Sequence, residues 1–376
     1  MKRTVMKLLS VILAVTLLSA CAPERSGIAY TVYPVGFLVE RMTGGSIPSE
    51  SIQEDVIVQR ATIREDWEEV LSSAAVFLHI GQLEPYYAMY SRDYASLVPD
   101  LIDLSVMNAV YDFRRYTEVN SDGEITFIES PYYRGEEFDL IDTDSRDLYL
   151  WMDPIAMLSM ARDVRDWLIS AYPDEQAAFE SNFELLENDL INLDAQYQAL
   201  ATSNEVNERQ IKFVTMTASF GNWQKTYGFQ VYPVILSKYG ALPNEAQLEL
   251  IEKRIKDDDV QYIVYESNMT QDMISLFNRI EDDLSLTRVE LSNLSSLTEA
   301  DKEAGKDYLS IMYENLAVLE TMAADRTELP EISEEDPEGD ANVISELPEP
   351  EEVEQALTWE EAYSTPSPEE ENTDKG

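Results

Sequence analysis

Apolar positions in the first hundred residues form short runs, separated by stretches with helical spacing. Strands are expected at Ile28–Tyr33, Val56–Val58 and Ala74–Ile80. Helices are expected at Pro34–Met42 and Trp67–Ser72. The run Ala74–Ile80 is apolar apart from His79 near its end, which is typical of a strand buried on both faces of a parallel sheet. Strands that alternate with helices predict βαβ units and therefore a parallel sheet.

The alternation breaks between about Tyr111 and Ser145. Tyr116–Val119 and Ile125–Ile128 are β-like runs, and the residues between them end in Asp122-Gly123. The dipeptide Asp-Gly favours the tight turn of a β-hairpin. We therefore expect a hairpin inserted into the first half of the fold.

Two helices with clear starting signals follow. Asp153-Pro154 suits a helix start, because aspartate can cap free backbone amides and proline fits the first helical position. Pro173 opens a longer helix that reaches Ala201, roughly 40 Å at 1.5 Å per residue. Its apolar stripe consists of Phe179, Phe183, Leu186, Leu190, Leu193, Tyr197 and Leu200. The stripe predicts a strut between two domains, with a coiled-coil dimer seam as the alternative.

From Ile211 onward strands and helices alternate again. Strands are expected at Ile211–Met216, Val231–Leu236, Val260–Tyr265 and Leu286–Leu291. Helices are expected at Asn222–Tyr227, Glu245–Lys256, Thr270–Ile280 and Asp307–Met322. The fold class is therefore α/β, with two Rossmann-like lobes joined by one long rigid helix. We expect an N-terminal lobe over residues 28–171, the joining helix over 172–204 and a C-terminal lobe over 205–324.

The start of the chain has the features of an export signal. Three basic residues precede an apolar run, Leu8–Leu18, that is too short to span a bilayer. The run closes on Leu18-Ser19-Ala20-Cys21, which resembles the lipobox of bacterial lipoproteins, and Cys21 is the only cysteine of the chain. We expect a signal peptide over residues 1–20, lipidation at Cys21 and a linker over 21–27. An ordinary secretory signal is the alternative.

Charge and composition restrict the partners. The formal net charge is −46, which excludes nucleic acid as a partner and disfavours anionic lipid surfaces. Residues 325–376 are crowded with Glu, Asp, Pro and Ser and predict an acidic disordered tail. A solubilising tail, a weak cation sponge and a spacer all remain open for it.

Catalysis finds little support in the sequence. The only histidine is His79, at the end of an apolar strand, where a packed core histidine is more usual than a ligand. With Cys21 expected to be lipidated, neither a Ser-His-Asp nor a Cys-His arrangement can be drawn. We therefore expect no enzyme.

Several segments occur in the order typical of one known family. They are Trp151–Pro154, Tyr172-Pro173, Phe213–Gly221, Lys225–Gly228, Tyr265–Ser267, Gly305–Tyr308 and Met312–Leu316. Together they resemble the zinc/manganese solute-binding lipoproteins of ABC importers, over about residues 28–323. The resemblance implies two lobes that hold a zinc or manganese ion between them and deliver it to an ABC permease. It also implies an extracytoplasmic protein, anchored to the membrane by the lipid on Cys21.

The four positions that hold the metal in that family carry other residue types here. The resemblance places these positions at Gln59, Tyr149, Thr217 and Ser292. Zinc prefers thiolate, imidazole or carboxylate ligands, and manganese prefers anionic oxygen, so an amide, a phenol and two hydroxyls are poor replacements. The family's metal site is therefore degenerate in this sequence.

Two acidic residues are candidates for substitute ligands. Glu266 follows a strand at its carboxyl end and should face the cleft, although it could instead brace the neighbouring loop. Asp147 lies close in sequence to Tyr149. Three functions stay open: a metal-binding protein with substitute ligands, a binding protein for another small polar solute, and a surface interaction protein similar to an adhesin.

Overall fold

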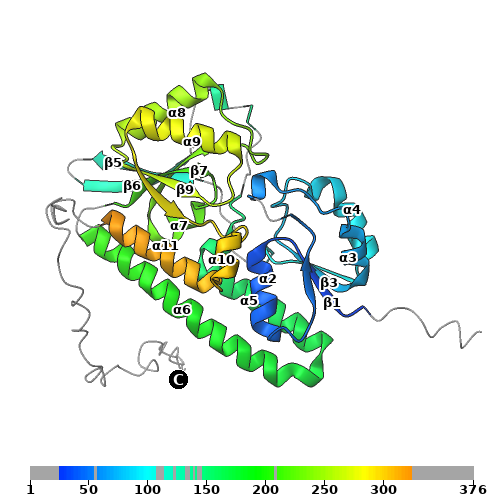
Figure 1. Cartoon of the computed structure of the whole chain (residues 1–376). Coiled ribbons are helices and arrows are strands. Elements are labelled where there is room, and N and C mark those ends of the chain that lie inside the picture. The colour runs from blue at the N-terminus through cyan, green and yellow to red at the C-terminus, as the bar shows by residue number, and fades with distance from the viewer. Residues whose placement is uncertain are drawn as a thin grey trace, which may run out of the picture. The chain divides into compact units, whose positions relative to one another are not determined.

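The computed structural model describes residues 25–54, 57–106, 114–121, 124–131, 136–138, 140–141, 146–206 and 210–323 (Figure 1). The expected signal peptide, Cys21 and the acidic tail lie outside these ranges. Within them, no helix has the length and apolar character needed to cross a membrane.

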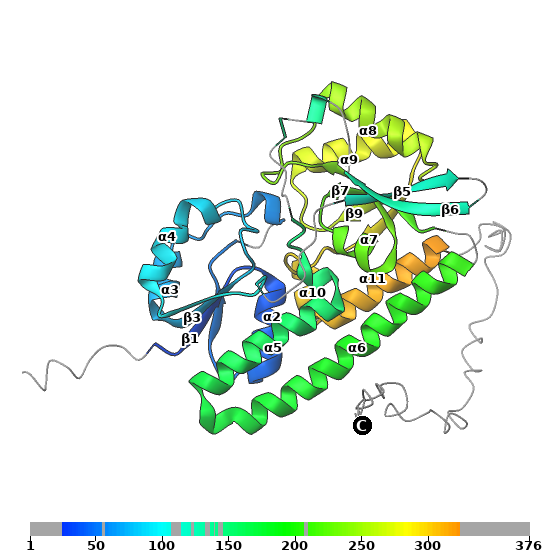
Figure 2. The ribbon, with the colours of Figure 1, turned by 180° about the vertical axis from the view of Figure 1, so that it is seen from behind.

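A four-stranded parallel sheet forms the centre of the first lobe, in the order β2-β1-β3-β4. Its strands are β1 (Gly27–Tyr30), β2 (Ser49–Ser51), β3 (Ala74–His79) and β4 (Asp100–Asp103). Its helices are α2 (Tyr33–Thr43), α3 (Trp67–Ser73) and α4 (Tyr87–Leu97). Helix α2 covers one face of the sheet, and α3 and α4 cover the other (Figures 1 and 2).

One strand predicted for this lobe is wrong. Val56 lies outside the described residues, and Val58 begins a 3₁₀ turn, η1 (Val58–Arg60). The edge strand of the sheet is the polar segment β2. Ile57 and Val58 are buried by tertiary contacts and take no part in a strand ladder. Apolar residues alone do not distinguish these two kinds of burial. For the opposite reason the apolar pattern does not reveal β4, a short edge strand that is largely exposed.

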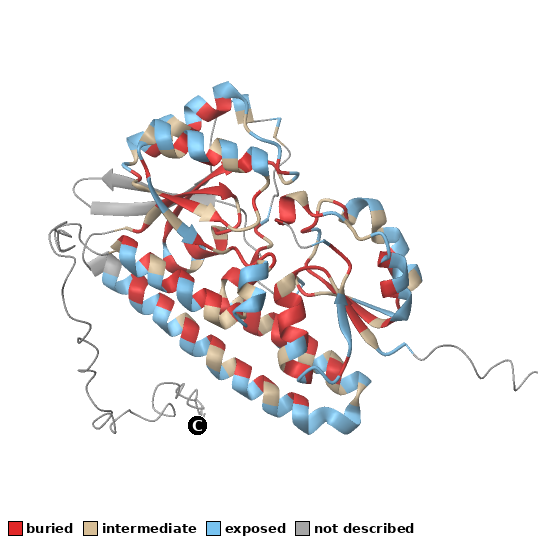
Figure 3. Ribbon diagram, in the orientation of Figure 1, coloured by how far each residue is buried: buried red, intermediate tan, exposed pale blue. Residues whose placement is uncertain are grey.

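The second lobe contains another four-stranded parallel sheet, in the order β10-β9-β7-β8. Its strands are β7 (Lys212–Thr217), β8 (Gln230–Ile235), β9 (Tyr262–Glu266) and β10 (Thr287–Leu291). Its helices are α7 (Gly221–Tyr227), α8 (Glu245–Asp257), α9 (Gln271–Leu284) and α10 (Glu299–Glu303). All four predicted strands are present within two residues of their expected bounds, and the two-lobed α/β class is confirmed. Figure 3 shows that the central strands of both sheets are largely buried.

One long helix runs past both lobes, and two shorter helices lie against it, one beside each lobe. They are α5 (Pro154–Ala171), α6 (Gln176–Val206) and α11 (Tyr308–Ala323), and α6 packs against α5, α11 and α2 (Figure 2). The 31 residues of α6 make it about 46 Å long, as expected of a strut. The apolar stripe of α6 is buried inside this chain, with exposed fractions of 0–8%. The alternative of a coiled-coil dimer seam is therefore wrong.

The predicted hairpin is present as antiparallel strands β5 (Arg114–Ser121) and β6 (Glu124–Pro131), with Ser121 paired to Glu124. Strand β5 lies beside α7 and β8, and the turn η2 (Glu136–Phe138) lies beside α8. Gln247 of α8 donates its Nε2–H to the Glu137 carbonyl at 2.7 Å. The hairpin therefore lies on the second lobe, although it interrupts the sequence of the first (Figures 1 and 2).

Candidate functional site

The two parallel sheets bring their carboxyl-terminal loops into contact with each other. In open α/β sheets the crevice beyond the carboxyl ends of the strands is the usual ligand site. Here the Tyr33 amide, just after β1, donates to the Ser295 carbonyl, just after β10, at 3.4 Å. The candidate site is therefore the boundary between the loops that follow these strands.

Glu266 and Thr217 lie at the ends of the neighbouring strands β9 and β7 and bind each other directly. Glu266 Oε1 accepts from the Thr217 amide at 2.8 Å, and Oε2 accepts from the Thr217 hydroxyl at 2.5 Å and from Asn293 Nδ2 at 2.9 Å. Thr217 and Glu266 are both fully buried. Burial raises the pKa of Glu266, and the hydrogen bonds from Thr217 and Asn293 oppose this shift. Both oxygens of the carboxyl group are thus engaged in bracing the loops.

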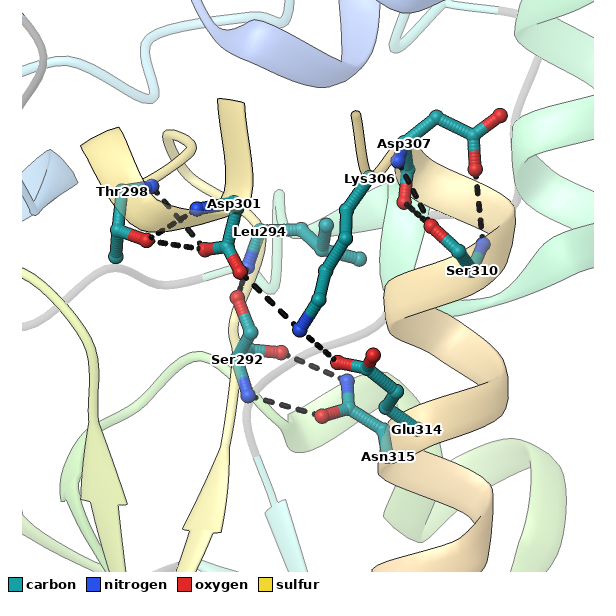
Figure 4. A network of polar contacts seen from close by, with 9 residues as sticks. All are labelled: Ser292, Leu294, Thr298, Asp301, Lys306, Asp307, Ser310, Glu314 and Asn315. Atoms are coloured by element: carbon teal, nitrogen blue, oxygen red, sulfur yellow. Dashed lines mark hydrogen bonds and ion pairs between the residues drawn. The ribbon is translucent and has the colours of Figure 1, made fainter. Parts of the chain in front are cut away.

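Ser292 lies in the loop after β10 and is held by its backbone (Figure 4). Its amide donates to Asn315 Oδ1 at 2.9 Å, and its carbonyl accepts from Asn315 Nδ2 at 2.8 Å. Its hydroxyl accepts from the Leu294 amide at 3.1 Å. Leu294 has a φ of 57°, a left-handed conformation that is rare for a residue with a side chain and persists only where the surroundings impose it.

An ion-pair network lies beside this loop. Lys306 Nζ lies 2.8 Å from Glu314 Oε2 and 3.4 Å from Asp301 Oδ1 (Figure 4). Lys306 thereby links the α10 region to α11. Asn315 of the same helix α11 holds the loop that carries Ser292, which favours a rigid wall over an adaptable one.

The first lobe contributes Tyr149, which is buried against Trp151 with ring centroids 5.1 Å apart. The Tyr149 amide donates to Asp147 Oδ1 at 3.0 Å, so Asp147 orients the segment before the 3₁₀ turn η3 (Leu150–Met152). The Tyr149 carbonyl accepts from Asn222 Nδ2 of the second lobe at 3.0 Å. Tyr149 thus lies at the contact between the lobes, and its role in ligand binding stays a prediction.

Buried indole and phenol groups join the lobes next to Tyr149. Trp151 Nε1 donates to the Asn293 carbonyl at 2.8 Å, and the Tyr308 hydroxyl donates to the Trp151 carbonyl at 2.6 Å. Trp223 Nε1 donates to the Met152 carbonyl at 2.7 Å. Fully buried and hydrogen-bonded aromatic groups of this kind stabilise an interface strongly. Nothing in the residue spacing reveals these partners, because donors and acceptors lie 71 to 157 positions apart.

Gln59 lies in η1, away from the Thr217–Glu266 pair in sequence but also at the lobe boundary. A Cβ atom placed on Gly240 of the second lobe would lie 3.2 Å from Gln59 Cβ. Gln59 is 6% exposed, and its Oε1 has no hydrogen-bond partner among the described residues. The structure therefore places Gln59, Tyr149, Thr217 and Ser292 in the loops at or near this boundary, and their roles remain a prediction.

His79 is a packed residue, in agreement with its position in the sequence. It is 2% exposed, lies between the rings of Phe77 and Tyr87, and its Nδ1 is 3.0 Å from the Gly81 carbonyl. Burial lowers its pKa, against the opposing effect of Asp103, so the neutral imidazole is favoured.

The donor set does not fit a zinc ion bound as in the resembling family. Across the part of the chain that the structure describes, no group of three or more His, Cys, Asp or Glu residues is placed to hold a metal ion. Glu266, the acidic candidate of the second lobe, already accepts three hydrogen bonds from protein donors. Asp147, the acidic candidate of the first lobe, accepts one from the Tyr149 amide. A dication at this site would have to displace them or bind neutral oxygens.

Sequence reasoning missed one buried acid in the first lobe. Glu84 follows β3 and is 2% exposed, and neither of its carboxyl oxygens accepts a well-aligned hydrogen bond. Burial raises its pKa to about 7, although the nearby Thr31 hydroxyl partly opposes this shift. A carboxyl group shortly after a buried strand, and directly before Pro85, is the only signal that the sequence offers for it.

Several known zinc-uptake proteins are similar to this chain in sequence. The sequence model for the zinc-uptake complex component A, periplasmic (ZnuA), matches residues 28–322. The zinc-binding lipoprotein AdcA of Streptococcus pneumoniae strain R6 is 24% identical over 329 residues, which cover 84% of this chain. The match spans 60% of the length of AdcA. The high-affinity zinc uptake system protein ZnuA of Bacillus subtilis is 22% identical over 173 residues, covering 46% of this chain and 52% of that protein.

Solved structures show the same fold. The Zn(II)-bound ZnuA-like domain of Streptococcus pneumoniae AdcA superposes with a TM-score of 0.59 at 22% identity, covering 80% of this chain and 99% of that domain. The periplasmic zinc-binding protein TroA from Treponema pallidum superposes with a TM-score of 0.61 at 16% identity, covering 80% of this chain and all of TroA. At these identities the superpositions establish the shared fold and leave the ligand of this chain open.

Proposed function

This chain belongs to the family of the periplasmic zinc-uptake component ZnuA, and from that membership we propose that it is the extracytoplasmic solute-binding component of a metal-type ABC importer. The match over residues 28–322, which includes both lobes and the strut, carries the proposal. In this role the chain binds a solute between its lobes and presents it to a permease. It performs no catalysis, and a lipid on Cys21 holds it at the membrane.

The chemistry of the cleft argues that this component does not bind zinc by the set of ligands that the resemblance implies. Gln59, Tyr149, Thr217 and Ser292 offer only neutral oxygens. The Glu266 carboxyl group is engaged by Thr217 and Asn293, and the Asp147 carboxyl group accepts from the Tyr149 amide. Stripping water from a dication without anionic or imidazole ligands is unfavourable. A small polar solute fits such a wall better, because neutral hydrogen-bonding groups can orient it without a charge.

Zinc binding is therefore expected to be absent at the cleft. Full-length protein, purified and dialysed against a weak chelator that removes loosely held ions from the acidic surface, should contain well below one equivalent of zinc by elemental analysis. Zinc should also leave the unfolding temperature unchanged, whereas a ligand at a thousand times its Kd stabilises a protein by about 4 kcal/mol.

The matched variants Glu266→Gln and Glu245→Gln separate the outcomes. Glu266 is fully buried at the end of β9, while Glu245 lies on the surface of the same lobe in an ion pair with Arg279. One equivalent of zinc that Glu266→Gln abolishes and Glu245→Gln retains would contradict the degenerate site. It would make Glu266 a substitute ligand and zinc the cargo.

A second candidate function is a surface interaction protein that no longer transports a solute. The direct hydrogen bonds from Asn222, Trp223 and Tyr308 to the segment Tyr149–Met152 favour it, because they join the lobes without any ligand. Loss of solute uptake in a strain that lacks the chain would support the importer; unchanged uptake would support this second function.

A further inference from the structure

The segment Ile57–Arg60 of the first lobe, here called the latch segment, inserts into the second lobe. Ile57 is 1% exposed and belongs to the apolar core formed by β7, β8, β9, α8 and α9. Among the described residues before Val214, Ile57 is the one fully buried side chain in that core. Burying an isoleucine side chain contributes roughly 1.5–3 kcal/mol, so this insertion favours contact between the lobes.

Arg60 adds an ion pair that fixes the position of the latch segment. Its Nη2 lies 3.0 Å from Oδ2 of Asp272, in the first turn of α9. A hydrogen bond from Thr270 lowers the pKa of Asp272, and Arg60 lowers it further. Both side chains are more than a third exposed, and pairs of this kind contribute little net stability. Arg60 therefore fixes the relative position of the lobes at this contact but contributes little to the free energy that keeps them together.

Gly240 makes the fit on the second lobe close. Its φ is +66°, and a Cβ atom there would lie 2.8 Å from Arg60 Nε and 3.2 Å from Gln59 Cβ. Any larger residue would therefore strain its own backbone and push against the latch segment. Gly305 has the same φ of +66° but no atom within 4 Å of its position for a Cβ, so it offers a control with equal backbone strain and no contact between the lobes.

We propose that the latch segment Ile57–Arg60 holds the two lobes closed in the absence of any ligand. In a two-lobed binding protein a ligand drives closure only through contacts that it makes in the closed state and not in the open one. Here the chain supplies such contacts itself, at Ile57, Arg60 and Gly240. They lie apart from the Trp151 and Trp223 hydrogen bonds, which join the lobes beside the start of α5.

The latch bears directly on the cleft, because Gln59 is part of it. Gln59 Oε1 is buried without a partner in the closed arrangement, which costs free energy. A solute that donates a hydrogen bond to this oxygen would remove that cost. Such a solute would therefore stabilise the closed arrangement further. This consequence rests on the proposed function, whereas closure itself does not.

Closure can be measured without a ligand by the distance between two spin labels. The labels are placed on exposed residues of α4 and α8, through Asp93→Cys and Glu249→Cys, in the full chain with Cys21→Ser. The parent protein should give one narrow distance distribution. Gly240→Ala should add a population at longer distance, and Gly305→Ala should not.

Ile57→Ala provides an independent test, because it removes the anchor and leaves Gly240 unstrained. Truncating a buried isoleucine typically lowers the stability of the packed state by at least about 2 kcal/mol. The ratio of open to closed molecules should therefore rise at least about tenfold. A broad distribution in the parent, or distributions unchanged by both Gly240→Ala and Ile57→Ala, would overturn the latch. Failure of the importer function would instead appear as absent solute binding with these distances unaffected.

Discussion

Replacement of Glu84 by glutamine should raise the free energy of unfolding at pH 8 by up to about 3 kcal/mol. Glu84 is buried in the first lobe, and its pKa is raised from 4.5 to about 7. Each unit of difference between folded and unfolded pKa corresponds to about 1.4 kcal/mol. Glutamine has nearly the same shape and no charge, and its amide can donate to the Thr31 hydroxyl oxygen, which has no hydrogen bond otherwise.

The direction in which stability changes with pH follows from the number of protons that the folded and unfolded states bind. Between pH 4.5 and about 7 the folded state holds the Glu84 proton while the unfolded state loses it, so stability falls as the pH rises. The stabilisation by the neutral carboxyl group is complete below pH 4.5 and is lost as the pH passes about 7. Glu84→Gln removes this decline.

Urea unfolding at several values between pH 5 and pH 8 measures the effect. His79, whose pKa is lowered by burial, destabilises the folded state towards acid pH, but it does so equally in both proteins and cancels in their difference. Glu68→Gln, an exposed change on α3, serves as the control and should shift the curves by less than about 0.5 kcal/mol. The same pH dependence in wild type and Glu84→Gln would refute a buried, neutral Glu84.

The elements that sequence periodicity predicts are those whose burial comes from their own sheet or helix. Strand β3 and the strut α6 carry their burial pattern in the local sequence, as a continuous apolar run and a helical stripe. The burial of Ile57 and Val58 cannot be predicted from their local sequence, because Ile57 packs into the core of the other lobe. A one-dimensional pattern records that a residue is apolar but not which surface covers it.

The same limit applies to the site. The sequence predicts that Glu266 follows a strand at its carboxyl end, where it faces the cleft or braces a loop. It does not predict that β9 lies beside β7 and so brings Glu266 against Thr217. The engagement of Glu266 by Asn293 depends on the conformation of the loop after β10, in which Leu294 takes a left-handed φ. No residue spacing predicts that loop, nor the contact of Gly240 with Arg60.

Truncation of Glu266 to alanine should lower the free energy of unfolding by about 3 kcal/mol or more. The change removes the acceptor of three buried hydrogen bonds, from the Thr217 amide, the Thr217 hydroxyl and Asn293 Nδ2. Each unsatisfied buried donor costs roughly 1–3 kcal/mol, and the cavity left by the side chain adds to this. Relief from burying the carboxyl group, whose pKa is raised, offsets part of the loss.

Glu266→Gln should cost less, roughly 1–3 kcal/mol. Its amide oxygen still accepts from the Thr217 amide and the Thr217 hydroxyl can turn to accept, so only Asn293 Nδ2 loses its acceptor. This order of stabilities, alanine below glutamine and glutamine below wild type, is expected if Glu266 joins β7, β9 and the loop after β10. A zinc ligand would behave differently. Then a strong chelator would destabilise the wild type to the level of Glu266→Ala, and glutamine would rescue nothing, since a neutral amide replaces an anionic ligand poorly. Urea unfolding of the three proteins, each with and without chelator, therefore decides whether Glu266 holds the lobe together or holds a metal.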